Sequence, residues 1–319
     1  MDESWSSRNG TDSQDEADAL GRRKPALVSV IIPAYNAEET IGAQLEALGR
    51  QDYEGPWELI IADNGCTDHT RDVVASFHER FPGLRVVDAS ERRGPAHARN
   101  AGAAAAEGDL LLFCDADDVV SLSWIQAMAQ ASTFADLLGG VGALTRSPDA
   151  DVVPVVPGAP PDPALFPFLP WVGAANLGVR RQQFKAVAGF DETRLTGEDV
   201  DLCWRMQLQG VPLRFVPDAY VSYRERDSLR EAFTRTYGFG RAAHELYLAY
   251  RGCGAPTPGL RWALRGGLRL LGRAPMLLLG SERRRRWVTR AGGVVGRLSA
   301  VLRYTLRRHT AIKGQKESR

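Results

Sequence analysis

The chain has 319 residues, of which 44% are hydrophobic and 25% are charged, and its formal net charge is +1. This length and composition suit one large α/β domain with an appendage. The four cysteines have no C-x-x-C spacing, which argues against both a disulfide framework and a zinc site.

The first 24 residues contain six acidic side chains and no apolar segment, so we do not expect a secretory signal. Residues 1–26 are instead expected to form a disordered leader. Elsewhere, the uninterrupted apolar runs are much shorter than the roughly 18 residues that a membrane span requires. The sequence therefore predicts a cytoplasmic protein.

The small net charge conceals an uneven distribution of charge along the chain. Residues 251–319 hold 17 Lys or Arg and 2 acidic residues, whereas residues 1–250 hold 23 basic and 37 acidic ones. The body is thus at −14 and the tail at +15. Such an asymmetry predicts that the tail meets something anionic.

The first half of the chain alternates β-branched apolar runs with segments of helical period. A strand is expected at 27–32, ended by Pro33, and Asn36 with Glu39 forms a capping-box-like start for the helix that follows. Further strands are expected at 57–62, 84–87 and 109–114, and helices around 73–77, 95–106 and 121–129.

This alternation of strands and helices predicts a doubly wound, mostly parallel sheet. In such sheets, ligands bind beyond the carboxyl ends of the strands. Three of the expected ends carry notable polar residues: Tyr35 with Asn36, Asp63, and Asp115 with Asp117. We therefore expect these residues to share one site.

The second half of the chain begins with a proline-rich segment. Residues 151–170 contain seven prolines, too many for regular structure, and are expected to form a loop or lid. The elements expected after it are a strand at 171–179, a helix at 182–187, a helix from Glu198, a strand at 213–216 and helix beyond 227.

Three carboxylates, Asp115, Asp117 and Asp118, follow the apolar run at 109–113. A buried strand that ends in clustered carboxylates presents hard oxygen ligands where a divalent cation and a phosphate could meet. Alternatively, the motif is only an acidic loop tip, or Asp117 and Asp118 only cap the helix expected at 121–129. The motif alone is compatible with all of these interpretations.

Five blocks of residues, taken in order, resemble the family 2 glycosyltransferases. The blocks are 28–36, 58–68, 94–102, 115–117 and 197–199. The resemblance implies a GT-A nucleotide-diphospho-sugar transferase fold, which is Rossmann-like, over residues 27–240. Residues 241–319 would then form a basic, amphipathic helical C-terminal region.

The resemblance also implies how a nucleotide-sugar would be bound. Asp117 would be the direct ligand of Mn²⁺ or Mg²⁺, which would offset the charge on the leaving nucleoside diphosphate. Tyr35 would contact the base, and Asp63 would accept a hydrogen bond from it, unless Asp63 only forms a turn before Gly65. Arg99 would neutralise phosphate or pair with Asp63. The implied nucleotide-sugar-binding residues are Pro33, Ala34, Tyr35, Glu39, Asp63, Gly94, Arg99, Asp115 and Ala116.

Members of this family invert the anomeric centre, so one carboxylate must take the proton of the acceptor hydroxyl. By the resemblance this general base is Asp199, while Glu198 and Trp171 would hold the acceptor. The plain alternative is that Glu198 and Asp199 are first-turn acids that the helix dipole favours.

The chain departs from the family's pattern after the last short strand. Many relatives carry a His there that completes the metal shell, whereas residues 220–224 of this chain read Tyr-Val-Ser-Tyr-Arg, with Tyr223 in place of the His. Either water and diphosphate complete the shell, or Arg224 and Arg226 neutralise part of the charge.

The basic tail has an amphipathic pattern. Arginines at 261, 265, 269 and 273 recur every four residues beside leucines, and residues 287–302 carry a second apolar face. Cationic amphipathic helices lie at anionic bilayer surfaces, although a helix pair docked on the acidic body would have the same pattern. We expect no nucleic acid, because the leucine face would have no purpose there.

Taken together, the sequence favours an inverting, metal-dependent glycosyltransferase. It would move a sugar from a nucleoside-diphosphate sugar to a hydroxyl of a glycan, lipid-linked or secondary-metabolite acceptor, in the cytoplasm or at the inner face of the cell membrane. One alternative is a non-catalytic relative that binds membranes. The other is a sugar-nucleotide nucleotidyltransferase, but residues 33–36 lack the Gly-rich phosphate loop that this class requires.

Overall fold

The computed structural model describes residues 24–145, 166–224, 228–256 and 260–317. Two compact units make up the chain: the first comprises residues 1–161 and 170–224, and the second residues 162–169 and 225–319. Residue 240, where the sequence analysis ends the first domain, lies within a helix of the second unit. Most of the leader and of the proline-rich segment lies outside the described residues.

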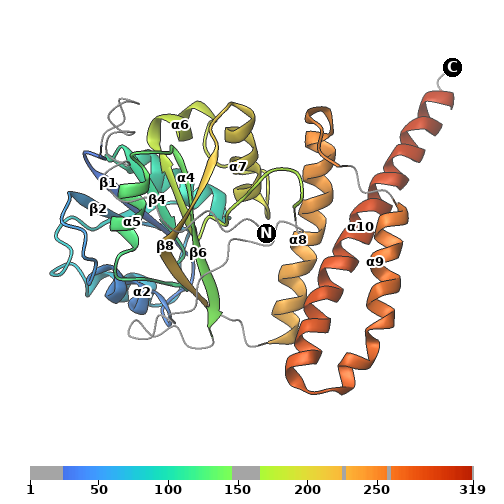
Figure 1. Ribbon diagram of the computed structural model, residues 1–319, viewed down its shortest axis with the longest axis horizontal. Coiled ribbons are helices and arrows are strands. Elements are labelled where there is room, and N and C mark those ends of the chain that lie inside the picture. The colour runs from blue at the N-terminus through green and yellow to red at the C-terminus, as the bar shows by residue number, and fades with distance from the viewer. Residues whose placement is uncertain (1–23, 146–165, 225–227, 257–259, 318–319) are drawn as a thin grey trace, which may run out of the picture. The chain divides into compact units, whose positions relative to one another are not determined.

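The first unit is built on a sheet with helices packed beside it (Figure 1). The sheet has eight strands in the order β3-β2-β1-β4-β7-β6-β8-β5. Its strands are β1 (Val28–Ala34), β2 (Trp57–Asp63), β3 (Arg85–Asp88), β4 (Leu110–Cys114), β5 (Val119–Val120), β6 (Leu137–Thr145), β7 (Asn176–Arg180) and β8 (Leu213–Arg224). The first four strands pair in parallel, as do β6 and β8, whereas β7 runs antiparallel to both β4 and β6. This mostly parallel sheet confirms the predicted fold class.

Helices cover both faces of this sheet, because its central strands are apolar on both sides. The helices that pack on one face are α2 (Ile41–Leu48), α3 (Thr70–Ala75) and α5 (Trp124–Ala131), and those on the other are α4 (Pro95–Ala105), α6 (Arg181–Ala186) and α7 (Glu198–Leu208). Successive side chains of β1 point to opposite faces of the sheet. Val30 and Ile32 pack in the core beneath α2, α3 and α5, and Ile31 packs in the core beneath α4, α6 and α7. Continuous apolar runs are therefore required in β1 and β4.

The sequence predicts no strand at 137–145, where the structure has β6. Three glycines weaken the strand signal there. They permit close packing instead, because a Cβ on Gly140 would lie 2.1 Å from Asn176 Oδ1 and one on Gly142 would lie 2.2 Å from the Val221 carbonyl oxygen. Tertiary packing between β7 and β8 thus decides the conformation of this segment.

Strand β8 extends to Arg224, whereas the sequence predicts its end at 216. The sequence pattern of a strand is interrupted at Pro217, which has no backbone N–H to donate to a neighbouring strand. The structure accommodates this proline in an irregularity: Gly140 pairs with Val216, and the next residue of β6, Val141, pairs with Tyr220. The strand therefore continues past its proline.

Asn36 does not cap the first helix, contrary to the capping-box prediction. The N-cap of α2 is Thr40. Asn36 lies in a turn with a left-handed backbone (φ +48°), and its Oδ1 accepts a hydrogen bond from the Thr67 backbone N–H at 2.9 Å. Its side chain therefore joins the loops that follow β1 and β2.

The second unit contains the predicted basic helices. They are α8 (Leu229–Tyr250), α9 (Leu260–Gly272) and α10 (Ser281–Glu317), with two short 3₁₀ helices, η1 (Arg251–Cys253) and η2 (Ala274–Leu278). Among the described residues, no helix is both long and apolar enough to cross a membrane.

Helices α8 and α10 approach each other at glycines. A Cβ on Gly240 would lie 2.2 Å from the Gly293 carbonyl oxygen, and one on Gly296 would lie 2.2 Å from the Tyr237 carbonyl oxygen. The Tyr237 hydroxyl and Ser299 Oγ, 3.0 Å apart, form a hydrogen bond across the pair. Because the nearest neighbour is backbone at both positions, Gly240 and Gly296 have no room for a side chain.

Gly296→Ala is expected to destabilise the second unit by about 1–3 kcal/mol, the usual cost of overpacking. Gly293→Ala is the matched control on the same helix, because its Cβ would make an ordinary contact, 3.8 Å from the Thr236 carbonyl oxygen. That control should stabilise by up to about 1 kcal/mol through helix propensity. Urea unfolding of both variants measures the difference, and equal stabilisation by the two would contradict the close approach.

Candidate active site

The site begins where three parallel strands end side by side. Ala34 at the end of β1 is in register with Asp63 at the end of β2, and β4 lies on the other side of β1. The chain that leaves β4 carries Asp115, Asp117 and Asp118. Parallel pairing thus brings the predicted polar residues to one edge of the sheet.

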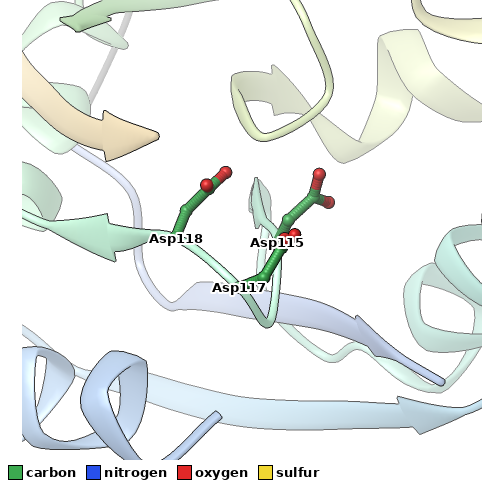
Figure 2. A group of neighbouring side chains, drawn as sticks. All are labelled: Asp115, Asp117 and Asp118. Carbon is green, nitrogen blue, oxygen red and sulfur yellow. The ribbon is translucent and has the colours of Figure 1, made fainter. Parts of the chain in front are cut away.

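The three carboxylates form a cluster on the turn between β4 and β5 (Figure 2). One carboxylate oxygen from each of Asp115, Asp117 and Asp118 lies within 4.8 Å of the others. Asp118 is buried, and its Oδ1 accepts a hydrogen bond from the backbone N–H of Arg224 at 2.9 Å. Three oxygens this close together fit a divalent cation such as Mg²⁺ or Mn²⁺.

The capping alternative for these carboxylates is wrong. Strand β5 lies between them and α5, whose N-cap is Ser123. Gln44 of α2 holds the turn instead: its Nε2 donates to the Asp115 carbonyl oxygen at 3.2 Å, and its Oε1 accepts from the Val120 N–H at 3.0 Å. The sequence alone does not indicate a role for Gln44, because nothing in an apolar helix marks one glutamine as the support of a distant turn.

Arg99 of α4 connects the acidic turn with the start of α7. Its Nη2 donates to Asp115 Oδ1 at 2.7 Å and its Nη1 donates to Glu198 Oε1 at 2.9 Å. Burial of the guanidinium lowers its pKa, but the carboxylates of Asp115 and Glu198 outweigh burial and raise the pKa above its ordinary value. Arg99 therefore pairs with these two carboxylates and not with Asp63, the partner considered from the sequence.

Asp199 lies at the beginning of α7, beside Glu198. The helix starts after Gly197, whose left-handed backbone (φ +80°) turns the chain into it. Asp199 Oδ1 accepts from the Val200 N–H at 2.8 Å, and Oδ2 accepts from the Ala174 N–H at 3.4 Å. Burial, reinforced by the Glu198 carboxylate, raises the pKa of Asp199 to about 7. Such a pKa suits a general base at neutral pH.

Asp63 is buried and ionised at the end of β2. Its Oδ1 accepts from the backbone N–H groups of Gly65 (3.1 Å) and Cys66 (2.8 Å), and its Oδ2 pairs with Arg71. Burial raises the pKa of Asp63, but the hydrogen bonds from Cys66 and Arg71 outweigh burial, so that its pKa is lowered. The turn considered from the sequence therefore forms at Gly65. Because its pKa is lowered, the Asp63 carboxylate can only accept hydrogen bonds at neutral pH.

Tyr35 lies near Asp63 and is 52% exposed. The guanidinium of Arg93 lies over the Tyr35 ring, 4.4 Å from its centroid. Buried Asn64 holds the loop that carries Arg93: its Nδ2 donates to the Arg92 carbonyl oxygen at 2.8 Å, and its Oδ1 accepts from the Gly94 N–H at 2.8 Å. Neither Arg93 nor Asn64 is predicted from the sequence. The adjacency of Asn64 to Asp63 is the one signal that points to it.

The remaining predicted residues lie at varied depths. Pro33 and Ala34 end β1, Ala116 is buried within the acidic turn, and Glu39 is exposed on the turn before α2. Trp171 is partly buried against the core under α6 and α7. Two residues farther on, the chain passes Asp199, since a Cβ on Gly173 would lie 3.7 Å from Asp199 Oδ2.

Comparison with known proteins shows what this chain is similar to. A profile described as "Glycosyl transferase family 2" matches residues 29–149. A pre-mycofactocin glycosyltransferase of Mycobacterium tuberculosis is 27% identical over 249 residues, covering 72% of this chain and 49% of that protein. A validoxylamine A glucosyltransferase of Streptomyces hygroscopicus subsp. limoneus is 29% identical over 223 residues, covering 59% and 49%. The chain thus spans about half the length of these curated relatives.

A solved structure has the same fold. It is the mannosyltransferase PcManGT from Pyrobaculum calidifontis, in complex with GDP-Man and Mn²⁺, with a TM-score of 0.58, 19% identity and coverage of 88% of both chains. This likeness confirms the GT-A type of fold that the sequence blocks imply.

Proposed function

We propose that this chain, whose residues 29–149 match the profile of the family 2 glycosyltransferases, is an inverting, metal-dependent enzyme of that class. It transfers a sugar from a nucleoside-diphosphate sugar to a hydroxyl of a glycan, lipid-linked or secondary-metabolite acceptor. The observation that carries the proposal is the Arg99 bridge, which ties the acidic turn at Asp115 to Glu198, next to a carboxyl group whose pKa is about 7.

The donor nucleotide is assigned to the ends of β1 and β2. Tyr35 contacts the base, with Pro33, Ala34 and Glu39 around it, and ionised Asp63 accepts a hydrogen bond from a base N–H. Support comes from the hydrogen bonds that fix Asp63 and from its lowered pKa, which keeps it an acceptor. We add Arg93 to this group, because its guanidinium lies over the exposed Tyr35 ring at the same edge of the sheet.

The acidic turn is assigned to a divalent cation and the donor diphosphate. The cluster of Asp115, Asp117 and Asp118 would hold Mn²⁺ or Mg²⁺, with Asp117 as the ligand predicted from the sequence and Asp118 as an additional one. When bound, the cation supplies charge neutralisation for the nucleoside diphosphate as it leaves. The resemblance implies a His where this chain has Tyr223, and we assign the role of that missing ligand to the buried Asp118.

Asp199 is assigned as the general base. Its carboxylate accepts the proton of the acceptor hydroxyl as the hydroxyl oxygen attacks the anomeric carbon and the bond to the diphosphate breaks. The raised pKa supports this role, because a carboxylate with an ordinary pKa would be a much weaker base at neutral pH. Glu198 and the neighbourhood of Trp171 hold the acceptor, and Glu198 is itself fixed by Arg99.

A membrane surface is the last partner that we propose. The tail carries 17 basic and 2 acidic residues over 251–319, which favours contact with an anionic surface. A peripheral position at the inner face of the cell membrane would bring the protein to a lipid-linked acceptor.

Nucleotide binding tests the donor and metal assignments. UDP or GDP with Mn²⁺, at about 100 times the dissociation constant, is expected to raise the Tm by roughly 5 °C, whereas Asp117→Asn should lose the Mn²⁺-dependent part of that rise. Asp72→Asn, which alters an 80% exposed carboxylate on α3, is the matched control and should respond like the wild type. A wild type that no nucleotide stabilises would refute the donor assignment, and an unchanged response in Asp117→Asn would refute the metal assignment.

A further inference from the structure

The outward face of α9 and the segment after it carries an unusual concentration of exposed leucines. We define the leucine surface as Leu264, Leu268, Leu271, Leu278 and Leu279. Leu268 is 69% exposed and Leu278 is 88% exposed. Exposing this much apolar area within 16 residues is costly for a surface that meets only water.

The orientation of α9 explains why these leucines face outward. Gly266 faces α10, because a Cβ there would lie 3.6 Å from Val294, and the Trp287 indole N–H donates to the Leu270 carbonyl oxygen at 3.1 Å. At roughly 100° per residue, Leu264, Leu268 and Leu271 fall within an arc of about 60° on the other side of the helix. The contact with α10 therefore leaves the leucine surface exposed among the described residues of the second unit.

Arginines border the leucine surface. Arg265 and Arg269 lie on the neighbouring arc of α9, and Arg273 follows its end, all of them exposed. No Asp or Glu occurs between Glu245 and Glu282 in the sequence. The segment that carries the leucine surface thus combines apolar area with positive charge, and its sequence contains no acidic residue.

We propose that the leucine surface enters an anionic lipid bilayer, with its leucines among the acyl chains and the bordering arginines at the phosphate headgroups. A bilayer provides both an apolar interior and negative charge at the depths that this arrangement requires. A nucleic acid would neutralise the arginines but would leave the leucines in water. The inference rests on the membrane association proposed above and identifies the face responsible for it.

Vesicle flotation of the full-length protein tests the proposal. The protein should float with phosphatidylcholine vesicles that contain phosphatidylglycerol and much less with pure phosphatidylcholine. Leu268→Gln with Leu271→Gln should weaken binding to the anionic vesicles at least about tenfold, because each buried methylene contributes to partitioning. Arg265→Gln with Arg269→Gln should reduce the preference for anionic lipid.

The matched control removes two comparably exposed leucines from the first unit, Leu122→Gln with Leu144→Gln, which are 57% and 58% exposed in the wild type. It should float like the wild type. If the variant with Leu268→Gln and Leu271→Gln bound anionic vesicles as strongly as the wild type, the proposal would be overturned. It would also be overturned if the wild type floated with neither kind of vesicle. Loss of self-association in that variant, without vesicle binding by the wild type, would assign the face to a second copy of the chain.

A second measurement separates this proposal from the catalytic one. Hydrolysis of donor sugars, followed without vesicles as released nucleoside diphosphate, should be the same in the leucine variants and the wild type. If the wild type releases no nucleoside diphosphate but still floats, the glycosyltransferase proposal fails and the membrane face stands. If the wild type hydrolyses donor but never floats, the membrane face is refuted and the glycosyltransferase proposal stands.

Discussion

Asp199→Asn is expected to lower the rate of sugar transfer by about 10²–10⁴-fold, the usual contribution of a general base. Asparagine retains an oxygen that can accept from the Val200 N–H, so the start of α7 should keep its structure. Binding of UDP or GDP should remain unchanged, because the nucleotide is assigned to the ends of β1 and β2 and not to α7. A donor-hydrolysis assay with a titration of nucleotide measures both quantities.

The pH profile provides a sharper test of the same residue. Because burial and Glu198 raise the pKa of Asp199 to about 7, kcat/KM of the wild type should increase with pH and level off above about pH 7. Glu198→Gln removes a neighbouring negative charge and should move this midpoint to lower pH. A midpoint that is the same in both proteins, or a variant Asp199→Asn as active as the wild type, would refute the assignment of the base.

The same raised pKa predicts that the stability of the wild type falls as pH rises, whereas its activity increases. The folded state holds the Asp199 proton more tightly than the unfolded state, so the contribution of this carboxyl to stability is complete below its ordinary pKa and is lost as pH rises to about 7. Asparagine does not titrate. Unfolding measured from pH 4 to pH 8 should therefore show Asp199→Asn gaining stability relative to the wild type as pH rises.

Arg99→Met is expected to destabilise the first unit by about 3–5 kcal/mol, because it leaves the carboxylates of Asp115 and Glu198 without their buried counter-charge. Arg99→Lys should recover part of this loss, since an ammonium keeps the charge but lacks the fork that reaches both carboxylates. Urea unfolding is the direct measurement.

Arg80→Met is the matched control for this prediction. Arg80 forms an ion pair with Glu46 on the surface, where both side chains are over a third exposed, and exposed pairs contribute at most about 1 kcal/mol. If Arg99→Met proved no more damaging than Arg80→Met, the proposed link between the acidic turn and α7 would lose its energetic basis.

The sheet edge could be predicted because its signals are local. Each parallel strand is a short apolar run, and Asp63 and Asp115 stand directly after two of these runs. Once the strands pair in parallel, their carboxyl ends must meet. The carboxylate cluster follows from the same local pattern, although the sequence alone leaves a helix cap open for Asp118, which the position of β5 before α5 excludes.

The rest of the site depends on contacts between distant residues. Arg99 and Glu198 are 99 positions apart, and no local pattern marks the arginine of a helix as the partner of two carboxylates. Strand β6 was missed for a related reason, because its glycines disfavour a strand until β7 and β8 pack closely against them. Packing of this kind cannot be deduced from propensity alone.

The guanidinium of Arg99 keeps its proton at any pH that a folded protein survives. Within the contact that joins α4 to α7, the cation is therefore permanent, and the adjustable group is the carboxyl next to Glu198. Under the mechanism proposed for Asp199, substitutions around that single carboxyl would shift the pH at which the protein is active. The tie between two distant parts of the polypeptide would stay intact throughout such a change.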